Sequence, residues 1–199
     1  MASVRSQTGA WDPARPTEGA YAALLNFTDG AFATLTYSGY GHFDSDELMG
    51  GVGELGQMKD ATSYGAARRA LSSTGDPDAE EAAKAARAYG GVDFRAASGA
   101  ARGNEHFGLV VVACERGDIR PMPDGVHVFT DNERRFEPLA PPAVPRAAVL
   151  DALCGAAFEN RAATQDGPWG RATLEVCLAL LESAPSGAEV ALHHQVAVR

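Results

Sequence analysis

The stretch GAYAALLNFTDGAFATLTYSGY, residues 19–40, decides the fold. It contains two runs rich in aromatic, Leu and Thr residues, which flank the dipeptide Asp29-Gly30. Asp-Gly favours a two-residue hairpin turn, because both central residues of that turn take a positive φ. A turn centred there pairs Leu24 with Leu35 and gives both faces of the hairpin apolar side chains. We therefore expect a β-sheet that is covered on both faces.

The residues after this hairpin predict a loop and then helices. Residues 39–63 are rich in glycine and acidic residues without a clear period, so we expect a long loop there. A helical insertion over about 63–91 follows, in which Ser63 caps a first helix and Pro77 starts a second. The second helix is alanine-rich, which is typical of a surface helix.

The second half of the chain predicts more strands and then two helices. Residues 107–115, FGLVVVACE, form an apolar run typical of a buried strand. We expect three short strands at 118–122, 125–130 and 134–139, then two helices at about 146–160 and about 168–184, and a closing strand at 189–198. Strands and helices in separate runs predict an α+β fold with an open, mainly antiparallel sheet and helices packed on one face. We expect residues 1–199 to form a single domain.

Charge excludes some classes of partner. Lys and Arg total 17 and Asp and Glu total 26, which gives a net charge of −9. An acidic chain is repelled by the phosphates of nucleic acids and by anionic membrane surfaces, so neither is an expected partner. No apolar run approaches the roughly 20 residues of a membrane span, and residues 1–16 lack the apolar core of a signal peptide. We expect a cytoplasmic protein.

The cysteines point to the same compartment. There are three, Cys114, Cys154 and Cys177, so the number is odd and no C-x-x-C pair exists. Cys154 and Cys177 lie in apolar helical patterns, where buried free thiols are expected.

A glycine motif matches a nucleotide-binding pattern. Residues 51–56 read Gly-Val-Gly-Glu-Leu-Gly, which satisfies G-x-G-x-x-G. A dinucleotide site needs this motif between a buried strand and a helix, and the residues before it here are HFDSDELM. Because Asp44, Asp46 and Glu47 would repel a pyrophosphate, we interpret the motif as a flexible glycine loop.

The five histidines do not predict a metal site. No pair has the spacing of a helical metal motif, and His193 and His194 point to opposite faces of a strand. His42 and His106 lie in or beside long loops, where either one can act as a general acid or base or bind substrate. A solvated loop histidine is the alternative for both.

Two arginines are candidate anion ligands. In the segment ERGDIRPMPDG, strand alternation places Arg116, Asp118 and Arg120 on one face. Two guanidinium groups on one face can bind a carboxylate through paired hydrogen bonds. Asp118 can equally pair with both arginines.

Three segments carry a resemblance to the carboxy-terminal half of the Gfo/Idh/MocA oxidoreductases. They are WDPARPTEGAYAALLNFTDGAFATLTYSGYGHFDSDE at 11–47, FGLVVVACERGDIRPMPDGVHVF at 107–129 and GPWGRATLEVCLALLESAPSGAEV at 167–190. The first two are most similar to the phthalate dihydrodiol dehydrogenases within that family. The resemblance covers most of residues 4–199.

The resemblance implies an NAD(P)-dependent oxidoreductase whose Rossmann domain precedes this domain and is absent from this chain. The family's E-K-P lysine and its catalytic Asp and His have no match here, so no catalytic, cofactor-binding or metal residue is assigned. We expect NAD or NADP to bind the full-length parent and not this chain alone. The expected substrate is a hydroxylated ring such as a phthalate cis-dihydrodiol, or a sugar-like polyol. Its candidate ligands are Tyr40, His42, His106, Arg116 and Arg120.

The resemblance also implies self-association, because one sheet face of this family commonly forms the oligomer interface. We expect a dimer or a tetramer. The alternative function is a stand-alone, non-catalytic module of the same fold that oligomerises or binds a small ligand.

Overall fold

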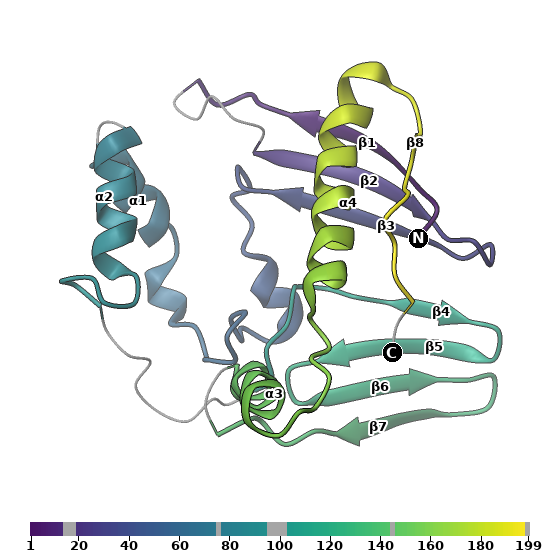
Figure 1. Cartoon of the computed structure of the whole chain (residues 1–199). Coiled ribbons are helices and arrows are strands. Elements are labelled where there is room, and N and C mark those ends of the chain that lie inside the picture. The colour runs from purple at the N-terminus through teal and green to yellow at the C-terminus, as the bar shows by residue number, and fades with distance from the viewer. Residues whose placement is uncertain (14–18, 75–76, 95–102, 144–145, 198–199) are drawn as a thin grey trace. The chain divides into compact units, whose positions relative to one another are not determined.

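The structure, a computed structural model, describes residues 1–13, 19–74, 77–94, 103–143 and 146–197 (Figure 1). The chain divides into two compact units. The first unit comprises Met1–Gly41 and Asp151–Arg199, and the second comprises His42–Leu150. Each unit has its own antiparallel sheet, which confirms the α+β class and places the strands in two sheets instead of one.

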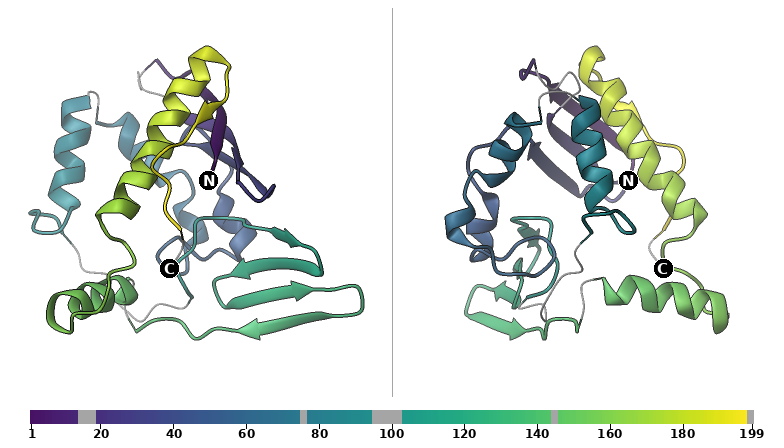
Figure 2. Two further views of the ribbon diagram at one scale, coloured as in Figure 1. Left: turned by 45° about the vertical axis from the view of Figure 1, so that its right-hand side comes forward. Right: turned by 90° about the vertical axis from the view of Figure 1, so that its left-hand side faces the viewer.

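The first unit is a four-stranded sheet covered by a long helix. The strand order is β3-β2-β1-β8, with every neighbouring pair antiparallel. The strands are β1 (Ser3–Gly9), β2 (Ala20–Asn26), β3 (Phe32–Ser38) and β8 (Val190–Ala191). The helix α4 (Gly167–Ser186) lies along one face of these strands, as Figure 2 shows from two sides. The closing strand is therefore much shorter than expected, because only two of its residues pair with β1.

The hairpin between β2 and β3 forms with a different register from the expected one. Leu24 pairs with Thr34 and Ala23 with Leu35. The backbone N–H of Phe27 donates to Ala31 at 2.9 Å, and Gly30 has φ +89°. A turn with an extra residue in the left-handed region replaces the two-residue turn.

This one-residue shift moves side chains to the other face of the sheet. Leu35 now lies on the face that α4 covers, across from Ala23. Leu24 lies on the opposite face, where its cross-strand neighbours are Arg5 and Thr34. Both faces still carry apolar side chains, because Leu24 and Phe32 lie on the face opposite α4, but the expected pairing of Leu24 with Leu35 is wrong.

The core of the first unit lies between the sheet and α4. Its buried members are Val4, Leu25 and Ala179, and Ala33 and Val176 pack against them. Small side chains on α4 allow the helix to approach the strands closely.

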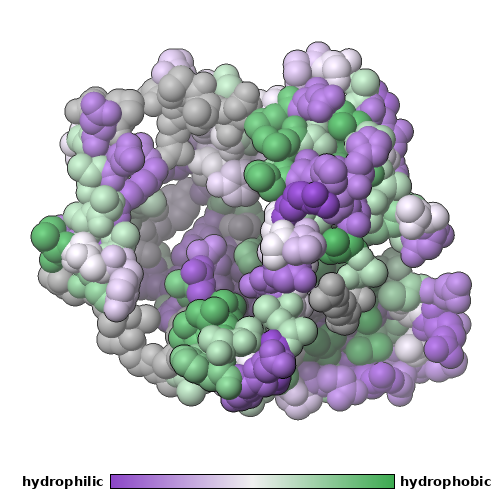
Figure 3. All heavy atoms as spheres, viewed as in Figure 1, coloured by the Kyte–Doolittle hydropathy of each residue, from purple (hydrophilic) through white to green (hydrophobic). Residues whose placement is uncertain are grey.

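The expected apolar stripes on the late helices face outward instead. On α4, Leu174, Leu178 and Leu181 are each more than half exposed, because Ala172, Ala179 and Ser183 form the side that meets the sheet. Helix α3 (Ala147–Phe158) likewise exposes its leucines, and apolar side chains gather over it near the bottom of Figure 3. The expectation of buried thiols is also wrong, since all three cysteines are exposed.

The second unit holds a meander of four strands and a helical segment. The strands β4 (Val112–Cys114), β5 (Gly117–Met122), β6 (Gly125–Phe129) and β7 (Arg134–Pro138) pair in sequence order, as expected from the turns. The helical segment contains η1 (Ser45–Met49), η2 (Ala61–Ser63), α1 (Ala66–Ser72) and α2 (Pro77–Arg87). The insertion predicted over 63–91 is therefore present.

Strand β4 differs from the buried strand predicted over 107–115. Only Val112–Cys114 pair as a strand, at the edge of the sheet. Phe107 is fully exposed and Val111 is 60% exposed. An edge strand has a neighbour on one side only, so its apolar composition alone does not bury it.

Candidate functional site

The glycine loop, residues 51–56, lies in the second unit and follows η1. Its backbone is used for internal hydrogen bonds: Gly53 N–H donates to Gln57 at 2.8 Å, and Gly56 N–H donates to Gly53 at 2.8 Å. The element before the loop is the short helix η1, and a bridge between Val52 and Met58 closes the loop. The strand, free amides and helix that cradle a pyrophosphate are therefore not arranged around residues 51–56.

His106 holds this loop in place. Its Nε2 donates to the Val52 carbonyl at 2.8 Å, and its Nδ1 accepts from Gly108 N–H at 3.0 Å. Its own backbone N–H donates to the Glu54 carbonyl at 3.2 Å. A carbonyl only accepts, so the proton lies on Nε2. Both ring nitrogens are engaged within the protein.

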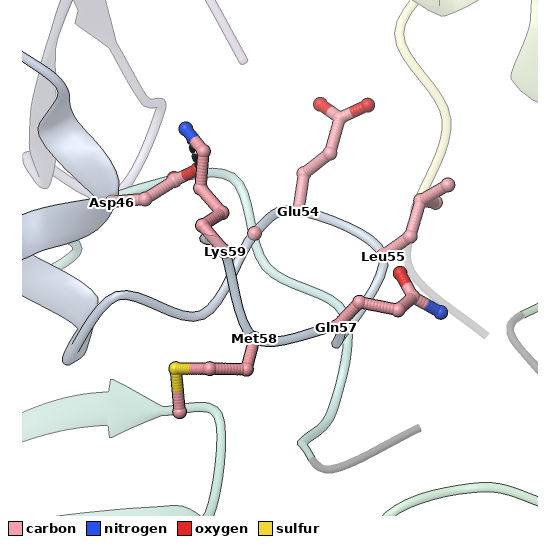
Figure 4. Close-up of a pocket in the computed structure, with 7 residues that line it drawn as sticks. Asp46, Glu54, Leu55, Gln57, Met58 and Lys59 are labelled. Carbon is pink, nitrogen blue, oxygen red and sulfur yellow. Dashed lines mark hydrogen bonds and ion pairs between the residues drawn. The ribbon is translucent and has the colours of Figure 1, made fainter. Parts of the chain in front are cut away.

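A pocket of about 450 Å³ opens beside the loop (Figure 4). Lys59 turns toward Asp46 there, at 3.0 Å, and also binds Asp44 at 2.5 Å. The hydrogen bond from Lys59 holds the pKa of Asp44 below its usual value, and the same bond raises the pKa of Lys59. Because two carboxylates neutralise the lysine and Glu54 adds another negative charge, the pocket does not favour an anion.

Arg120, in β5, is not among the residues that line this pocket. Its Nη2 donates to the Leu48 carbonyl of η1 at 3.0 Å. Its Nε is buried and has no hydrogen-bond partner among the residues that the structure describes. A guanidinium has five N–H donors, so this cation keeps unused hydrogen-bonding capacity.

Across from Arg120, on β6, lies His127, which sequence reasoning did not select. Its Nδ1 is also buried without a partner within the described part of the chain. Its ring lies 4.8 Å from that of Phe136, between centroids. The sequence does contain a feature that identifies His127, because a two-residue turn at Pro123-Asp124 pairs residue 127 with residue 120.

Arg116 is placed differently from Arg120. The strand begins at Gly117, and Arg116 lies in the exposed turn that joins Cys114 to Gly117. The expected strand alternation through 116, 118 and 120 is therefore wrong at its first position. Asp118 shares the face of Arg120, but no ion pair joins it to either arginine within the described ranges.

The remaining two candidates lie in different units. Tyr40 belongs to the first unit and is buried, with its ring centroid 4.6 Å from that of Trp11. A Cβ on Gly19 would meet the Tyr40 ring at 2.3 Å, so only glycine fits there. His42 belongs to the second unit, where it is exposed and its carbonyl accepts from the Tyr64 hydroxyl at 3.1 Å.

The described residues contain neither a metal-binding cluster nor a membrane-spanning helix. They contain no group of three or more His, Cys, Asp or Glu side chains that could hold a metal ion. Within the same ranges, none of the helices combines the length and apolarity needed to cross a membrane.

Two known proteins align with nearly the whole chain. One is 1-carboxy-3-chloro-3,4-dihydroxycyclohexa-1,5-diene dehydrogenase of Comamonas testosteroni, 39% identical over 183 residues, or 92% of this chain and 46% of that protein. The other is a solved structure from Bordetella bronchiseptica RB50, named only as a dehydrogenase, with 39% identity and a TM-score of 0.79 over 96% of this chain and 49% of that protein. The chain has the fold of one half of a dehydrogenase. It spans about half the length of these relatives.

More distant structures share this fold. An oxidoreductase of Agrobacterium radiobacter, solved with NAD⁺, L-tartaric acid and magnesium, is 14% identical with a TM-score of 0.54 over 96% of this chain and 43% of that protein. Levoglucosan dehydrogenase, solved with NADH and levoglucosan, is 13% identical with the same TM-score of 0.54 over 98% of this chain and 45% of that protein. No family model matches the chain.

Proposed function

We propose that this chain is the substrate-recognition half of an NAD(P)-dependent dehydrogenase that oxidises a carboxylated cyclohexadiene cis-diol. The observation that carries the proposal is the 39% identity, over 92% of the chain, to a dehydrogenase named for a carboxylated dihydroxycyclohexadiene. A phthalate cis-dihydrodiol belongs to the same chemical class, since it combines ring carboxylates with vicinal hydroxyls. A sugar-like polyol lacks the carboxylate and is the less favoured substrate.

The described residues do not fit a dinucleotide. The amides of Gly53 and Gly56 are occupied within their own loop, and the carboxylates of Asp46 and Glu54 line the adjacent pocket. A pyrophosphate needs free amides and positive potential. The role proposed for this chain is therefore to bind and orient the substrate, with the cofactor bound by the other half of the parent protein.

Arg120 is the proposed anchor for a ring carboxylate. It is a half-buried cation with a buried, unused Nε donor, and the Leu48 carbonyl holds its Nη2 in place. A guanidinium matches the two oxygens of a carboxylate, which an ammonium cannot do. Arg116 and His42, which belong to the same unit as Arg120, are proposed as further contacts. Tyr40 packs against Trp11 within the first unit, and His106 supports the glycine loop, so neither is proposed as a ligand in this site.

We also propose that the chain self-associates through the first sheet. The face opposite α4 carries Phe32, 70% exposed, and Leu24, 37% exposed. Strand β3 is also an edge strand of that sheet, and edge strands offer unpaired backbone groups to a second chain. Sedimentation of the chain is expected to give a dimer or tetramer, which Phe32→Glu weakens. A clean monomer would refute the proposal.

The test of the enzymatic proposal is turnover by the full-length protein. NADH or NADPH formation is measured with carboxylated cyclohexadiene cis-diols, a phthalate cis-dihydrodiol and polyols. For the preferred substrate, Arg120→Lys is expected to lower kcat/KM at least about 30-fold, or ~2 kcal/mol, because the ammonium keeps the charge but cannot form the guanidinium's paired hydrogen bonds to a carboxylate. The matched control is Arg135→Lys, because Arg135 is exposed and pairs with Glu133 and Glu137. No turnover of any carboxylated diol, with turnover of a polyol, contradicts the proposal.

A further inference from the structure

Arg120 and His127 form an unusual pair on the second sheet. They are direct cross-strand partners on β5 and β6, so both side chains lie on one face. Each has a buried nitrogen without a hydrogen-bond partner among the described residues, namely Nδ1 of His127 and Nε of Arg120. Two buried nitrogens without a described partner therefore belong to side chains that extend from neighbouring positions on one face of the sheet.

Burying two such nitrogens destabilises the fold unless a hydrogen-bond acceptor lies between the two side chains. A buried polar group without a partner loses its hydration and gains no hydrogen bond in return. A positive guanidinium beside an imidazole also offers no attraction to offset that loss. One acceptor with two oxygens, placed between the side chains, satisfies both nitrogens at once.

The surroundings select the kind of molecule that carries the acceptor. The His127 ring lies 4.8 Å from Phe136 and 6.1 Å from Phe129, between centroids. Phe136 is 39% exposed, so part of its surface is open to a ligand. An aromatic surface beside two nitrogen donors fits a flat, unsaturated ring with a carboxylate.

We propose that His127 and Arg120 together bind one carboxylate of an unsaturated ring, which packs on Phe136. This inference rests on the proposed function and adds to it His127 as the residue that selects carboxylated substrates. His127 donates through Nδ1 and Arg120 through Nε.

Two alternatives use only the protein's own groups. Arg120 Nε can donate to His127 Nδ1 after a small side-chain rotation. Alternatively, Asp118, which lies on the same face, can accept from Arg120. The other charged residue on this face, Arg134, lies with its guanidinium carbon 5.2 Å from the Phe129 ring centroid and accepts nothing. Both alternatives predict that the pair stabilises the fold and has no role in binding.

The experiment measures carboxylate binding and stability on the same variants. Phthalate, benzoate and neutral benzamide are titrated into the 199-residue chain by calorimetry, and thermal unfolding is followed without ligand. His127→Phe keeps the aromatic packing and removes both ring nitrogens. His127→Asn keeps an N–H donor near the position of Nδ1. Arg120→Lys keeps the charge and removes the planar guanidinium, and Arg135→Lys is the control.

We expect saturable binding of phthalate and benzoate but not benzamide. His127→Phe and Arg120→Lys weaken phthalate binding at least about tenfold, or ~1.4 kcal/mol. His127→Asn retains most of the affinity, and Arg135→Lys retains all of it. His127→Phe also raises the Tm, because it removes an unpartnered buried nitrogen.

Several results overturn the inference. They are no phthalate binding by the unmodified chain, an unchanged Kd in His127→Phe, or a lower Tm in His127→Phe, which indicates an internal partner. The results that refute this inference differ from those that refute the enzymatic proposal. Carboxylate binding at His127 without diol turnover by the full-length protein refutes only the enzymatic proposal, whereas turnover that His127→Phe leaves unchanged refutes only this inference.

Discussion

The two sheets of this chain have the same size and the same antiparallel pairing but very different interiors. The first sheet buries Val4 and Leu25 beneath α4, and together with Ala179 these residues form the hydrophobic core. In the second sheet, every strand residue except Gly125 is half-buried or exposed. The buried nitrogens of Arg120 and His127, which have no hydrogen-bond partner within the described ranges, lie on this second sheet. The comparison teaches that stability is concentrated in one sheet and unused binding capacity in the other.

The largest expected effect comes from breaking the core of the first sheet. Leu25 is 6% exposed, and truncating a buried leucine removes packing and leaves a cavity. Leu25→Ala is expected to lower the free energy of unfolding by about 2–4 kcal/mol. The matched control is Leu139→Ala after β7, where the side chain is 56% exposed and the change is within about 0.5 kcal/mol. Denaturant unfolding that finds equal losses for both variants contradicts the comparison.

A smaller loss is expected from the polar contact that joins α4 to β1. The Ser183 hydroxyl is fully buried, accepts from Ser6 N–H at 2.9 Å and donates to the Ala188 carbonyl at 2.6 Å. Ser183→Ala leaves both groups without a partner and is expected to cost about 1–3 kcal/mol in thermal unfolding. Ser186→Ala, on an exposed part of the same helix, serves as the control. If both serine variants unfold at the same temperature, the contact is not a stabilising one.

Acid is expected to release the chain that follows β8. Desolvation favours a higher pKa for Glu175, but hydrogen bonds from Gln195 and from the backbone N–H groups of His193 and His194 lower its pKa to about 2. A carboxyl with a depressed pKa in the folded state stabilises above its ordinary value of 4.5, and the stabilisation is lost as the pH falls from about 4.5 toward 2.

The measurement is an NMR titration of the His194 amide between pH 6 and 2. Its shift is expected to follow Glu175 in the unmodified chain, and to lose that response in Glu175→Gln. The control is Glu182→Gln on the same helix. A His194 titration that is identical in Glu175→Gln would show that another group anchors this segment.

The smallest expected effect concerns dinucleotides. Calorimetry with NAD⁺ and NADP⁺ is expected to show no saturable binding to this chain, because the amides of Gly53 and Gly56 are already bonded within the loop. Gly53→Ala is the comparison variant. Micromolar binding that Gly53→Ala abolishes would contradict both the loop assignment and the division of roles between the two halves of the parent.

The sequence predicted the first sheet's elements well, and the reasons are local. The apolar runs on either side of Asp29-Gly30 and the stripe-bearing helix over 168–184 both formed. The register was wrong because the turn has an extra residue, with Gly30 in the left-handed region. The leucines of α4 were expected inside because hydrophobicity alone cannot tell which face meets the sheet. Close packing favoured Ala172, Ala179 and Ser183.

The candidate site was only partly predictable. Arg120 was identified from strand alternation, but Arg116 fell in a turn because the strand starts one residue later. His127 was missed because strand alternation compares residues along one strand, whereas the importance of His127 comes from its partner across the two-residue turn at Pro123-Asp124. The roles of both ring nitrogens of His106 follow from contacts with Val52 and Gly108, and contacts of this kind have no sequence signature.

The central claim is that the second sheet, and not the first, recognises a carboxylated ring. The most direct measurement is an amide NMR titration of this chain with phthalate, with benzamide as the neutral control. The account predicts that phthalate shifts gather on β5 and β6 around Arg120 and His127, with no response along β1–β3, and that benzamide produces neither. Phthalate shifts that gather on β1–β3, or that spread evenly over both sheets, would contradict it.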